Sequence, residues 1–165
     1  MAPVTLQGPL SEVSRDARAY PVHLLREGDT GLCLFAAAFL GRNDAIHMAR
    51  NNMVVTCVDT DVDRLREMSA LYPDDWEFVT MDAWEFAAWA PESRDHNTYD
   101  VVSVDTFTGD ATDRSLESLD LWCSLARRVV TCTISPDSMF LAPEGWEHTY
   151  MERSDIASWL VLTRA

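Results

Sequence analysis

The 165-residue chain has an ordinary globular composition, with 47% hydrophobic and 24% charged residues, which suits one domain large enough to bury a core. Its charge is unusual, because 27 acidic side chains stand against 13 basic ones and give a formal net charge of −14. A field of that sign repels phosphate backbones, so it argues against nucleic acid as a partner and favours a cationic ligand.

Signals for secretion or membrane insertion are missing from the sequence. The first ten residues lack the basic segment and apolar segment of a signal peptide, and the longest apolar run, 32–40, is far shorter than a membrane span. The four cysteines are scattered without a C-x-x-C pair, and three of them fall in strand-like runs. We therefore expect a cytoplasmic protein with buried free thiols, without a disulfide framework, metal site or membrane contact.

Residues 1–30 are weakly patterned and are expected to form an N-terminal extension with a short helix over 11–20, ended by Pro21. From residue 31 to 165 the pattern is that of one domain. Apolar runs rich in β-branched residues predict strands at 31–36, 54–58, 76–81, 101–104 and 129–134. Helical periodicity lies between them, at 44–51 (with Asp44 or Asn43 as cap), 61–72, 83–90 and about 114–127. Two strand-like runs, 146–151 and 158–163, close the chain. This alternation predicts an α/β fold with a parallel sheet and helices on both faces.

Three predicted strands are followed by an aspartate: Asp59 after the second, Asp82 after the third and Asp105 after the fourth. The carboxyl ends of parallel strands share one edge of a sheet, and ligands of open α/β folds bind there, so these side chains are expected to line a ligand crevice. Asp59 is placed to accept hydrogen bonds from the hydroxyls of a ribose, and Asp82 from the amino group of a purine. The alternative is that all three aspartates cap the helices that follow them.

Three segments resemble the class I S-adenosylmethionine-dependent methyltransferase family: 54–59 (VVTCVD), 76–84 (WEFVTMDAW) and 99–105 (YDVVSVD). The resemblance covers roughly 30–165 and implies a single Rossmann-like, doubly wound sheet of about seven strands, mostly parallel, with an antiparallel C-terminal strand. It also implies S-adenosylmethionine as cofactor, with Asp59 at the ribose and Asp82 with Ala83 or Trp84 around the adenine.

The loop after the fourth predicted strand, 105–110 (DTFTGD), looks like that of the polyamine (spermidine) synthase branch of this fold. In that branch the acid at the position of Asp105 holds and deprotonates the attacking amine, so the resemblance implies a catalytic role for Asp105. A carboxylate suits this role because it stabilises an ammonium and then accepts its proton. Asp110, the second acid of the loop, is the other catalytic candidate.

The turn after the first predicted strand departs from the family. A glycine-rich turn is expected within 36–41, where Gly41 is the single glycine; Ala37 and Gly41 are the candidate cofactor-binding residues there. Glycine permits positive φ and close approach of the backbone to a ligand, and the Phe39 side chain would obstruct that approach. Either the amino-acid end of the cofactor is held differently or the cofactor is not bound.

Two functions from different classes therefore stay open. The first is an enzyme, a transferase that moves a methyl group (or, as a variant, an aminopropyl group) from an S-adenosylmethionine-type cofactor to a small acceptor, for which the charge favours a cation. The second is a non-catalytic acidic interaction protein that keeps the fold without the cofactor and binds a basic protein surface.

Overall fold

The computed structural model describes residues 21–165 apart from 38, 97, 107–108, 136–137 and 153–157. The helix predicted over 11–20 lies outside these residues, and the proposed boundary near residue 30 stays a prediction. The described chain begins with a short 3-10 helix, η1 (Val22–Leu24), and then enters the sheet.

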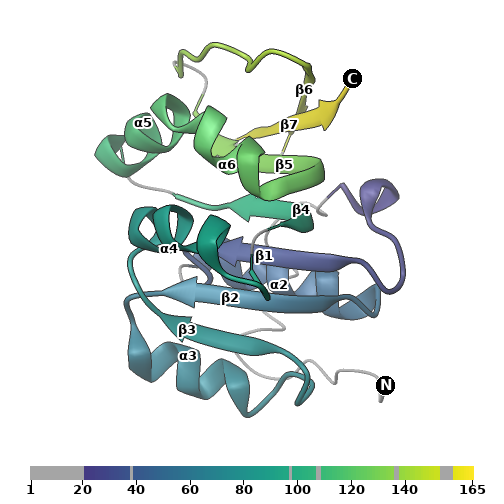
Figure 1. The fold of residues 1–165 in the computed structure, drawn as a ribbon, viewed down its shortest axis with the longest axis vertical. Helices are drawn as coiled ribbons and strands as arrows, with labels where there is room; N and C mark the ends of the chain where they lie inside the picture. Colours follow the sequence, from purple (N-terminus) through teal and green to yellow (C-terminus); the bar gives the residue numbers. More distant parts are fainter. Residues whose placement is uncertain (1–20, 38, 97, 107–108, 136–137, 153–157) are drawn as a thin grey trace.

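Within the described residues, a seven-stranded sheet forms the centre of the fold (Figure 1). Its strands are β1 (Thr30–Leu34), β2 (Val54–Asp59), β3 (Glu77–Thr80), β4 (Tyr99–Val104), β5 (Ala126–Ile134), β6 (Trp146–Glu152) and β7 (Ser158–Arg164). Their order across the sheet is β3-β2-β1-β4-β5-β7-β6. The strands β1 to β5 are parallel, while β7 lies antiparallel between β5 and β6. The predicted fold class is confirmed.

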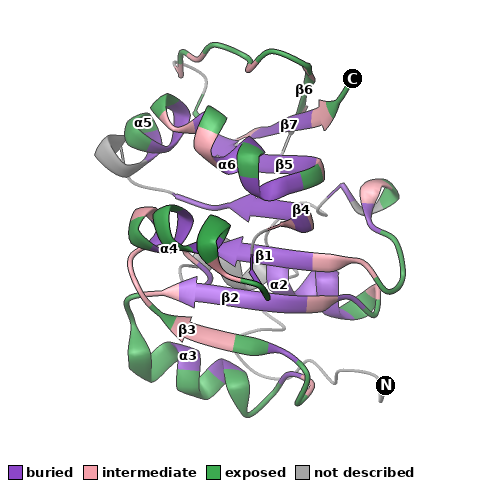
Figure 2. Cartoon of the chain, in the orientation of Figure 1, coloured by how far each residue is buried: buried purple, intermediate pink, exposed green. Residues whose placement is uncertain are grey.

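Helices cover both faces of the sheet. One core holds side chains of α2 (Phe39–Arg50) and α3 (Val62–Ser69), and the other holds those of α4 (Ala83–Trp89), α5 (Gly109–Glu117) and α6 (Leu119–Leu125). A 3-10 turn, η2 (Ala90–Glu92), follows α4. The central strands serve both cores and are buried along most of their length (Figure 2), which explains why their sequences are continuous apolar runs. No helix in the described ranges has the length and apolarity needed to cross a bilayer.

All four cysteines are free and buried, and three of them lie in strands as predicted: Cys33 in β1, Cys57 in β2 and Cys132 in β5. Cys33 and Cys57 are register partners in adjacent strands. The hydrogen bond between Cys33 and Cys57 and the burial of the thiol both raise the pKa of Cys33. Burial likewise raises the pKa of Cys123 to about 12. These thiols therefore stay protonated near neutral pH.

Two helix predictions were wrong in their bounds. The helix expected from Asp44 begins five residues earlier, at Phe39, and includes Gly41 in its first turn. Asp44 is therefore not a cap: it lies inside α2, fully buried, and accepts a hydrogen bond from Ser103 Oγ at 2.5 Å.

The second wrong prediction is the single helix over about 114–127. The chain forms α5 and α6 instead, and β5 already begins at Ala126. At the break, Ser118 Oγ donates to Arg114 O at 2.8 Å, and Trp122 Nε1 donates to Ser115 O at 2.9 Å. These side chains satisfy carbonyl groups at the end of α5.

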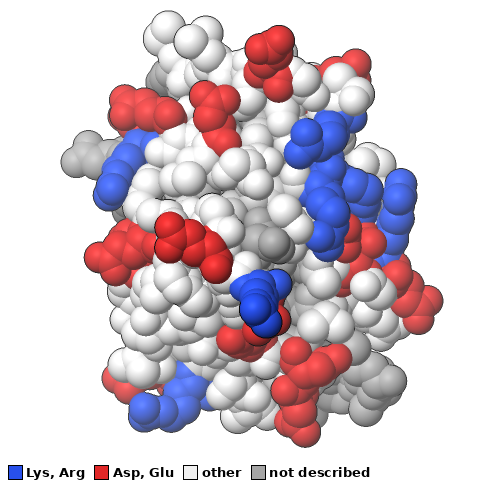
Figure 3. All heavy atoms as spheres, in the orientation of Figure 1, with Lys and Arg blue, Asp and Glu red and all other residues white. Residues whose placement is uncertain are grey.

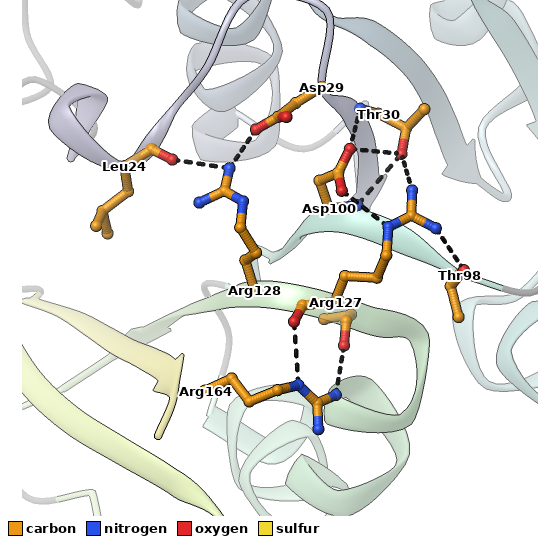
Figure 4. Close-up of polar contacts among 9 residues, drawn as sticks. Leu24, Asp29, Thr30, Thr98, Asp100, Arg127, Arg128 and Arg164 are labelled. Atoms are coloured by element: carbon orange, nitrogen blue, oxygen red, sulfur yellow. Dashed lines mark hydrogen bonds and ion pairs between the residues drawn. The ribbon is translucent and has the colours of Figure 1, made fainter.

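Arg127 ties three strands together at the edge where β1 and β4 begin (Figure 4). It donates to Asp100 Oδ1 at 2.8 Å, Thr98 Oγ1 at 2.6 Å and Thr30 Oγ1 at 3.1 Å. Beside it, Arg128 pairs with Asp29, and Arg164 donates to two backbone carbonyls of β5. In the space-filling view the largest group of basic side chains lies on this side of the molecule (Figure 3), away from the carboxyl ends of the parallel strands, and smaller basic groups lie elsewhere on the same face.

Candidate functional site

Asp59, Asp82 and Asp105 lie at one edge of the sheet, as predicted, because β2, β3 and β4 are parallel and each ends at or just before its aspartate. In Figure 1 this is the left-hand edge, toward which the arrowheads of β1 and β2 point. The chain winds from β1 toward β3 on one side and from β4 toward β5 on the other. The switch point of the sheet therefore lies between β1 and β4, where open α/β folds bind their ligands.

The turn after β1 has the backbone conformation of a glycine without having a glycine. Phe35, directly after β1, has a φ of 61°, in the left-handed region. Ala36 and Ala37 follow with 0% and 2% of their surface exposed, packed into the core beneath α2. Their methyl groups do not line an open crevice, so alanine at these positions is no obstacle to a ligand. Gly41 lies in the first turn of α2, and the Phe39 side chain lies outside what the structure describes.

Asp59 connects this turn to α3. Its Oδ2 accepts the Ala37 N–H at 3.0 Å, and its Oδ1 accepts the Asp61 N–H at 3.0 Å. Arg64 completes the link by donating to Ala37 O at 3.4 Å. The carboxylate is partly exposed, and each of its oxygens can accept more than one hydrogen bond. Asp59 therefore holds the turn in place and still has acceptor capacity for a ligand.

Asp82 is the N-cap of α4, which confirms the capping interpretation for this residue. Its Oδ1 accepts the backbone N–H of Trp84 at 3.0 Å and of Glu85 at 3.1 Å. Ala83 is buried, so its methyl group faces the core and only its backbone is left for a ligand. Contact of these residues with an adenine stays a prediction.

The Trp84 ring is partly covered by its neighbours. The Arg114 guanidinium carbon lies 3.7 Å from the ring centroid, a cation–π contact. The Phe35 ring meets it edge-on at 5.5 Å, and its indole N–H donates to Ser118 Oγ at 3.0 Å. An adenine that stacked on the covered face would have to displace Arg114. The neighbourhood therefore joins the turn after β1 to the start of α4 and the end of α5.

Asp105 is fully buried beyond the end of β4. Its Oδ1 accepts a hydrogen bond from the Thr133 hydroxyl on β5, and its N–H donates to Leu34 O of β1 at 3.4 Å. Because α5 begins at Gly109, four residues later, Asp105 is not the N-cap of that helix. It binds together the ends of β1, β4 and β5. Asp110 lies in the first turn of α5, with its side chain outside the described part of the structure.

No protein-family model and no characterised protein sequence matches the chain. Solved structures do match along most of its length. A Haemophilus influenzae protein described as a methylase superposes with a TM-score of 0.67 at 14% identity, over 95% of this chain and 99% of its own. An Escherichia coli protein described as a methyltransferase gives 0.63 at 16%, over 82% and 75%. A Pyrococcus horikoshii protein described as an RNA methyltransferase gives 0.60 at 16%, over 94% and 83%.

The chain has the Rossmann-like fold of these structures. Identities this low establish the fold alone, so the finer likeness to the spermidine synthase branch stays a prediction. Within the part of the chain that the structure describes, no cluster of three or more His, Cys, Asp or Glu side chains could hold a metal ion.

The Rossmann-like fold places three residues at this edge that sequence reasoning missed. Phe35 was missed because the expected turn began one residue later, and the continuous apolar run 32–40 does not mark the end of β1 at Leu34. Thr133 lies near the end of β5, next to β4, where the same strand-end argument applies. No pattern in the sequence predicts a role for Arg114, because its stacking on Trp84 depends on the packing of two helices.

Proposed function

We propose that this chain is a methyltransferase-like transferase that binds S-adenosylmethionine at the carboxyl edge of β1, β2 and β4 and acts on a small acceptor. The observation that carries the proposal is the contact of Asp59 with Ala37: an acid at the end of β2 grips the turn after β1. This contact lies beside the switch point between β1 and β4, and the sheet superposes on solved structures, several of which are described as methylases or methyltransferases.

The described residues fit the nucleoside half of that cofactor. The spare acceptor capacity of Asp59 suits the ribose hydroxyls, and the backbone around Asp82 and Ala83 suits an adenine edge. Trp84 offers an aromatic surface beside them, and an adenine that stacks on its covered face displaces the Arg114 guanidinium. When bound, the cofactor supplies an electrophilic methyl group; the protein binds and orients it and excludes water from it.

The acceptor that fits this chain is small and cationic. The net charge of −14 concentrates cations at the surface. Asp105 is the candidate for holding the acceptor and taking its proton. In the described conformation its carboxylate is covered and bonded to Thr133, so contact with an acceptor requires the loop between β4 and α5 to move. Aminopropyl transfer is a variant of this proposal that rests on the loop 105–110 alone.

A second candidate is the interaction protein without cofactor binding. The observation that favours it is the aromatic pair after β1: Phe35 begins the turn with a backbone conformation typical of glycine, and its ring contacts Trp84. Under this alternative the acidic surface binds a basic protein surface, and the strand-end acids serve only the fold.

Calorimetric titration of S-adenosylmethionine and S-adenosylhomocysteine separates the two candidates. We expect both ligands to bind the wild-type protein, and Asp59→Ala to weaken binding by roughly ten- to a hundredfold, the effect of losing a hydrogen bond to a charged group of about 1.5–3 kcal/mol. Asp63→Ala is the matched control, since this aspartate is exposed on α3 at 85% of its side-chain surface. A melting curve of each variant checks that the fold survives.

Two results would contradict the proposal in different ways. If neither ligand releases heat with the wild-type protein, the interaction protein is the better interpretation. If both ligands bind and Asp59→Ala behaves like Asp63→Ala, the cofactor is bound without the ribose contact assigned to Asp59.

A further inference from the structure

A pocket of about 370 Å³ lies at the far end of α5, where this helix breaks into α6. It is lined by Leu116, Glu117, Leu119, Asp120, Met139, Phe140 and Leu141. The last three belong to the segment before β6, which arches over α5 and α6 in Figure 1. A volume of this size falls within the range of about 300–1,000 Å³ typical of small-molecule sites. Asp105 precedes the opposite end of α5. The pocket borders the candidate cofactor site at Trp84, which donates to Ser118 Oγ, but Asp59, Asp82 and Asp105 are not among its lining residues.

The pocket has a buried apolar floor and an exposed apolar rim. Leu116 and Leu119 are almost fully buried, whereas Met139 and Leu141 are each 89% exposed. Phe140 anchors the segment between them, with its ring edge-on to His148 at 5.3 Å and to Tyr150 at 6.0 Å. Large apolar side chains held in water beside a pocket are typical of a binding surface.

Two carboxylates complete the lining. Glu117 ends α5 and Asp120 lies in the first turn of α6, both at least partly exposed and on either side of the break at Ser118. The lining residues include no basic side chain, and Arg114, one turn earlier, is stacked on Trp84. An occupant therefore meets apolar walls with negative charge at their edge, in a chain of net charge −14. A second copy of this chain is a poor occupant, because like charges would meet at the contact.

We propose that this pocket binds a small amphipathic cation: an ammonium or guanidinium group carried by an aromatic or alkyl body. The charged group lies between Glu117 and Asp120, and the apolar body lies against Leu116, Leu119 and Phe140. Met139 and Leu141 then lose their exposure to water by closing over the ligand, which adds hydrophobic stabilisation. The site goes beyond the proposed methyl transfer, and its test measures binding without any cofactor.

Three probes with one ring system and different charge test the proposal: tryptamine (cationic), tryptophol (neutral) and indole-3-acetate (anionic). Each is titrated into the full chain while proton–nitrogen correlation spectra are recorded, up to about 10 mM, which is enough to detect a millimolar dissociation constant. We expect tryptamine to shift the signals of the 138–145 segment and of the junction between α5 and α6, with binding weaker for tryptophol and weakest for indole-3-acetate.

Variants separate the pocket from the general field of the protein. Glu117→Gln combined with Asp120→Asn is expected to weaken tryptamine binding by about two- to fivefold per carboxylate, the range of an exposed ion pair. Asp63→Asn combined with Glu67→Gln removes the same charge from exposed positions of α3 and is expected to leave binding unchanged. Leu141→Ser removes an exposed apolar side chain without disturbing the core and is expected to weaken tryptamine and tryptophol alike.

Several results would overturn the proposal. Tryptamine that causes no shift at these residues excludes the site. Equal binding of all three probes shows an apolar site without charge selection. Equal loss in the two double variants shows that the field of the whole protein attracts the cation. Shifts that depend on protein concentration without any probe point to a second copy as the occupant.

Discussion

Phe35 combines an aromatic side chain with a backbone conformation that usually belongs to glycine. For a residue with a Cβ this region costs on the order of 1–3 kcal/mol, and it persists where the surroundings determine it. Here the constraint comes from both sides, because Ala36 N–H donates to Val58 O of β2 at 3.2 Å and the Phe35 ring lies against Trp84. The missing glycines were visible in the sequence. That the turn keeps its shape without them was not, because this depends on contacts with β2 and α4.

The role of Asp105 is tested by Asp105→Asn. The amide oxygen still accepts the Thr133 hydroxyl, so we expect the fold to survive. An amide cannot take a proton, so turnover of small amines is expected to fall by about 10²–10⁴-fold if Asp105 is the general base. A melting curve and a product assay against a panel of small amines measure the two effects. Thr133→Val is the control that removes the donor and keeps the carboxylate. An Asn variant as active as the wild type would exclude Asp105 from catalysis.

At the scale of elements, the strands were predicted well and the helix ends poorly. The run 54–58 became β2 with one further residue, because a strand buried on both faces is a local pattern of apolar side chains. The break between α5 and α6 lies at Ser118, whose Oγ accepts a hydrogen bond from the indole N–H of Trp84 in another helix. Contacts between residues so distant in the sequence leave no periodic pattern, so the sequence does not predict them.

Arg127 stabilises the sheet edge opposite the candidate site, and its contribution to the free energy of unfolding is expected to depend on pH. Burial opposes ionisation of Asp100, but the hydrogen bonds from Arg127 and Thr30 outweigh it and lower the pKa of Asp100. A lowered carboxyl pKa stabilises the fold above the unfolded value, near pH 4, and this contribution is lost as the pH falls through the folded value. Arg127→Gln is therefore expected to reduce the free energy of unfolding at pH 7 by about 1 kcal/mol or less, the range for a partly exposed pair, and the difference should shrink below about pH 4.

Urea unfolding of both proteins between pH 7 and pH 3 measures this difference. Arg66→Gln is the matched control, because its contact with Asp63 spans 3.9 Å between side chains that are 76% and 85% exposed. It is expected to leave stability unchanged at every pH. A difference for Arg127→Gln that stays constant as the pH falls would mean that packing, and not the ion pair with Asp100, carries the effect.

At the scale of the whole molecule, the sequence predicted the architecture and the edge where the site lies. Alternating strands and helices determine a parallel sheet, and a parallel sheet brings Asp59, Asp82 and Asp105 to one edge without knowledge of any contact. The depth of burial of Asp105 and the pocket near Met139 were not predictable. Both depend on how the segments after β4 and β5 fold back over the sheet.

The charge of the whole molecule argues against RNA as the acceptor. Some of the matched structures are described as RNA methyltransferases, and RNA binding depends on basic side chains that neutralise phosphates. In this chain Arg127 and Arg128 are paired with Asp100 and Asp29, and Arg164 is bound to backbone carbonyls. These three basic side chains, on the side where they gather in Figure 3, are thus engaged with the protein's own acceptors at the edge away from the candidate site.

We therefore expect fluorescein-labelled single-stranded and hairpin RNAs to bind more weakly than about 10⁻⁴ M at physiological salt, the weak limit of non-specific binding to nucleic acid. Fluorescence anisotropy measures this, and a labelled oligo-arginine peptide is the control probe of opposite charge. The peptide is expected to bind and to dissociate as salt rises, because the same field that repels phosphate attracts it. Micromolar RNA binding that weakens with salt would overturn the expectation. Such binding would require a basic surface other than the arginines paired in the described chain. RNA would then replace a small cation as the favoured acceptor, while the assignment of Asp59 to the cofactor would stand or fall on its own titration.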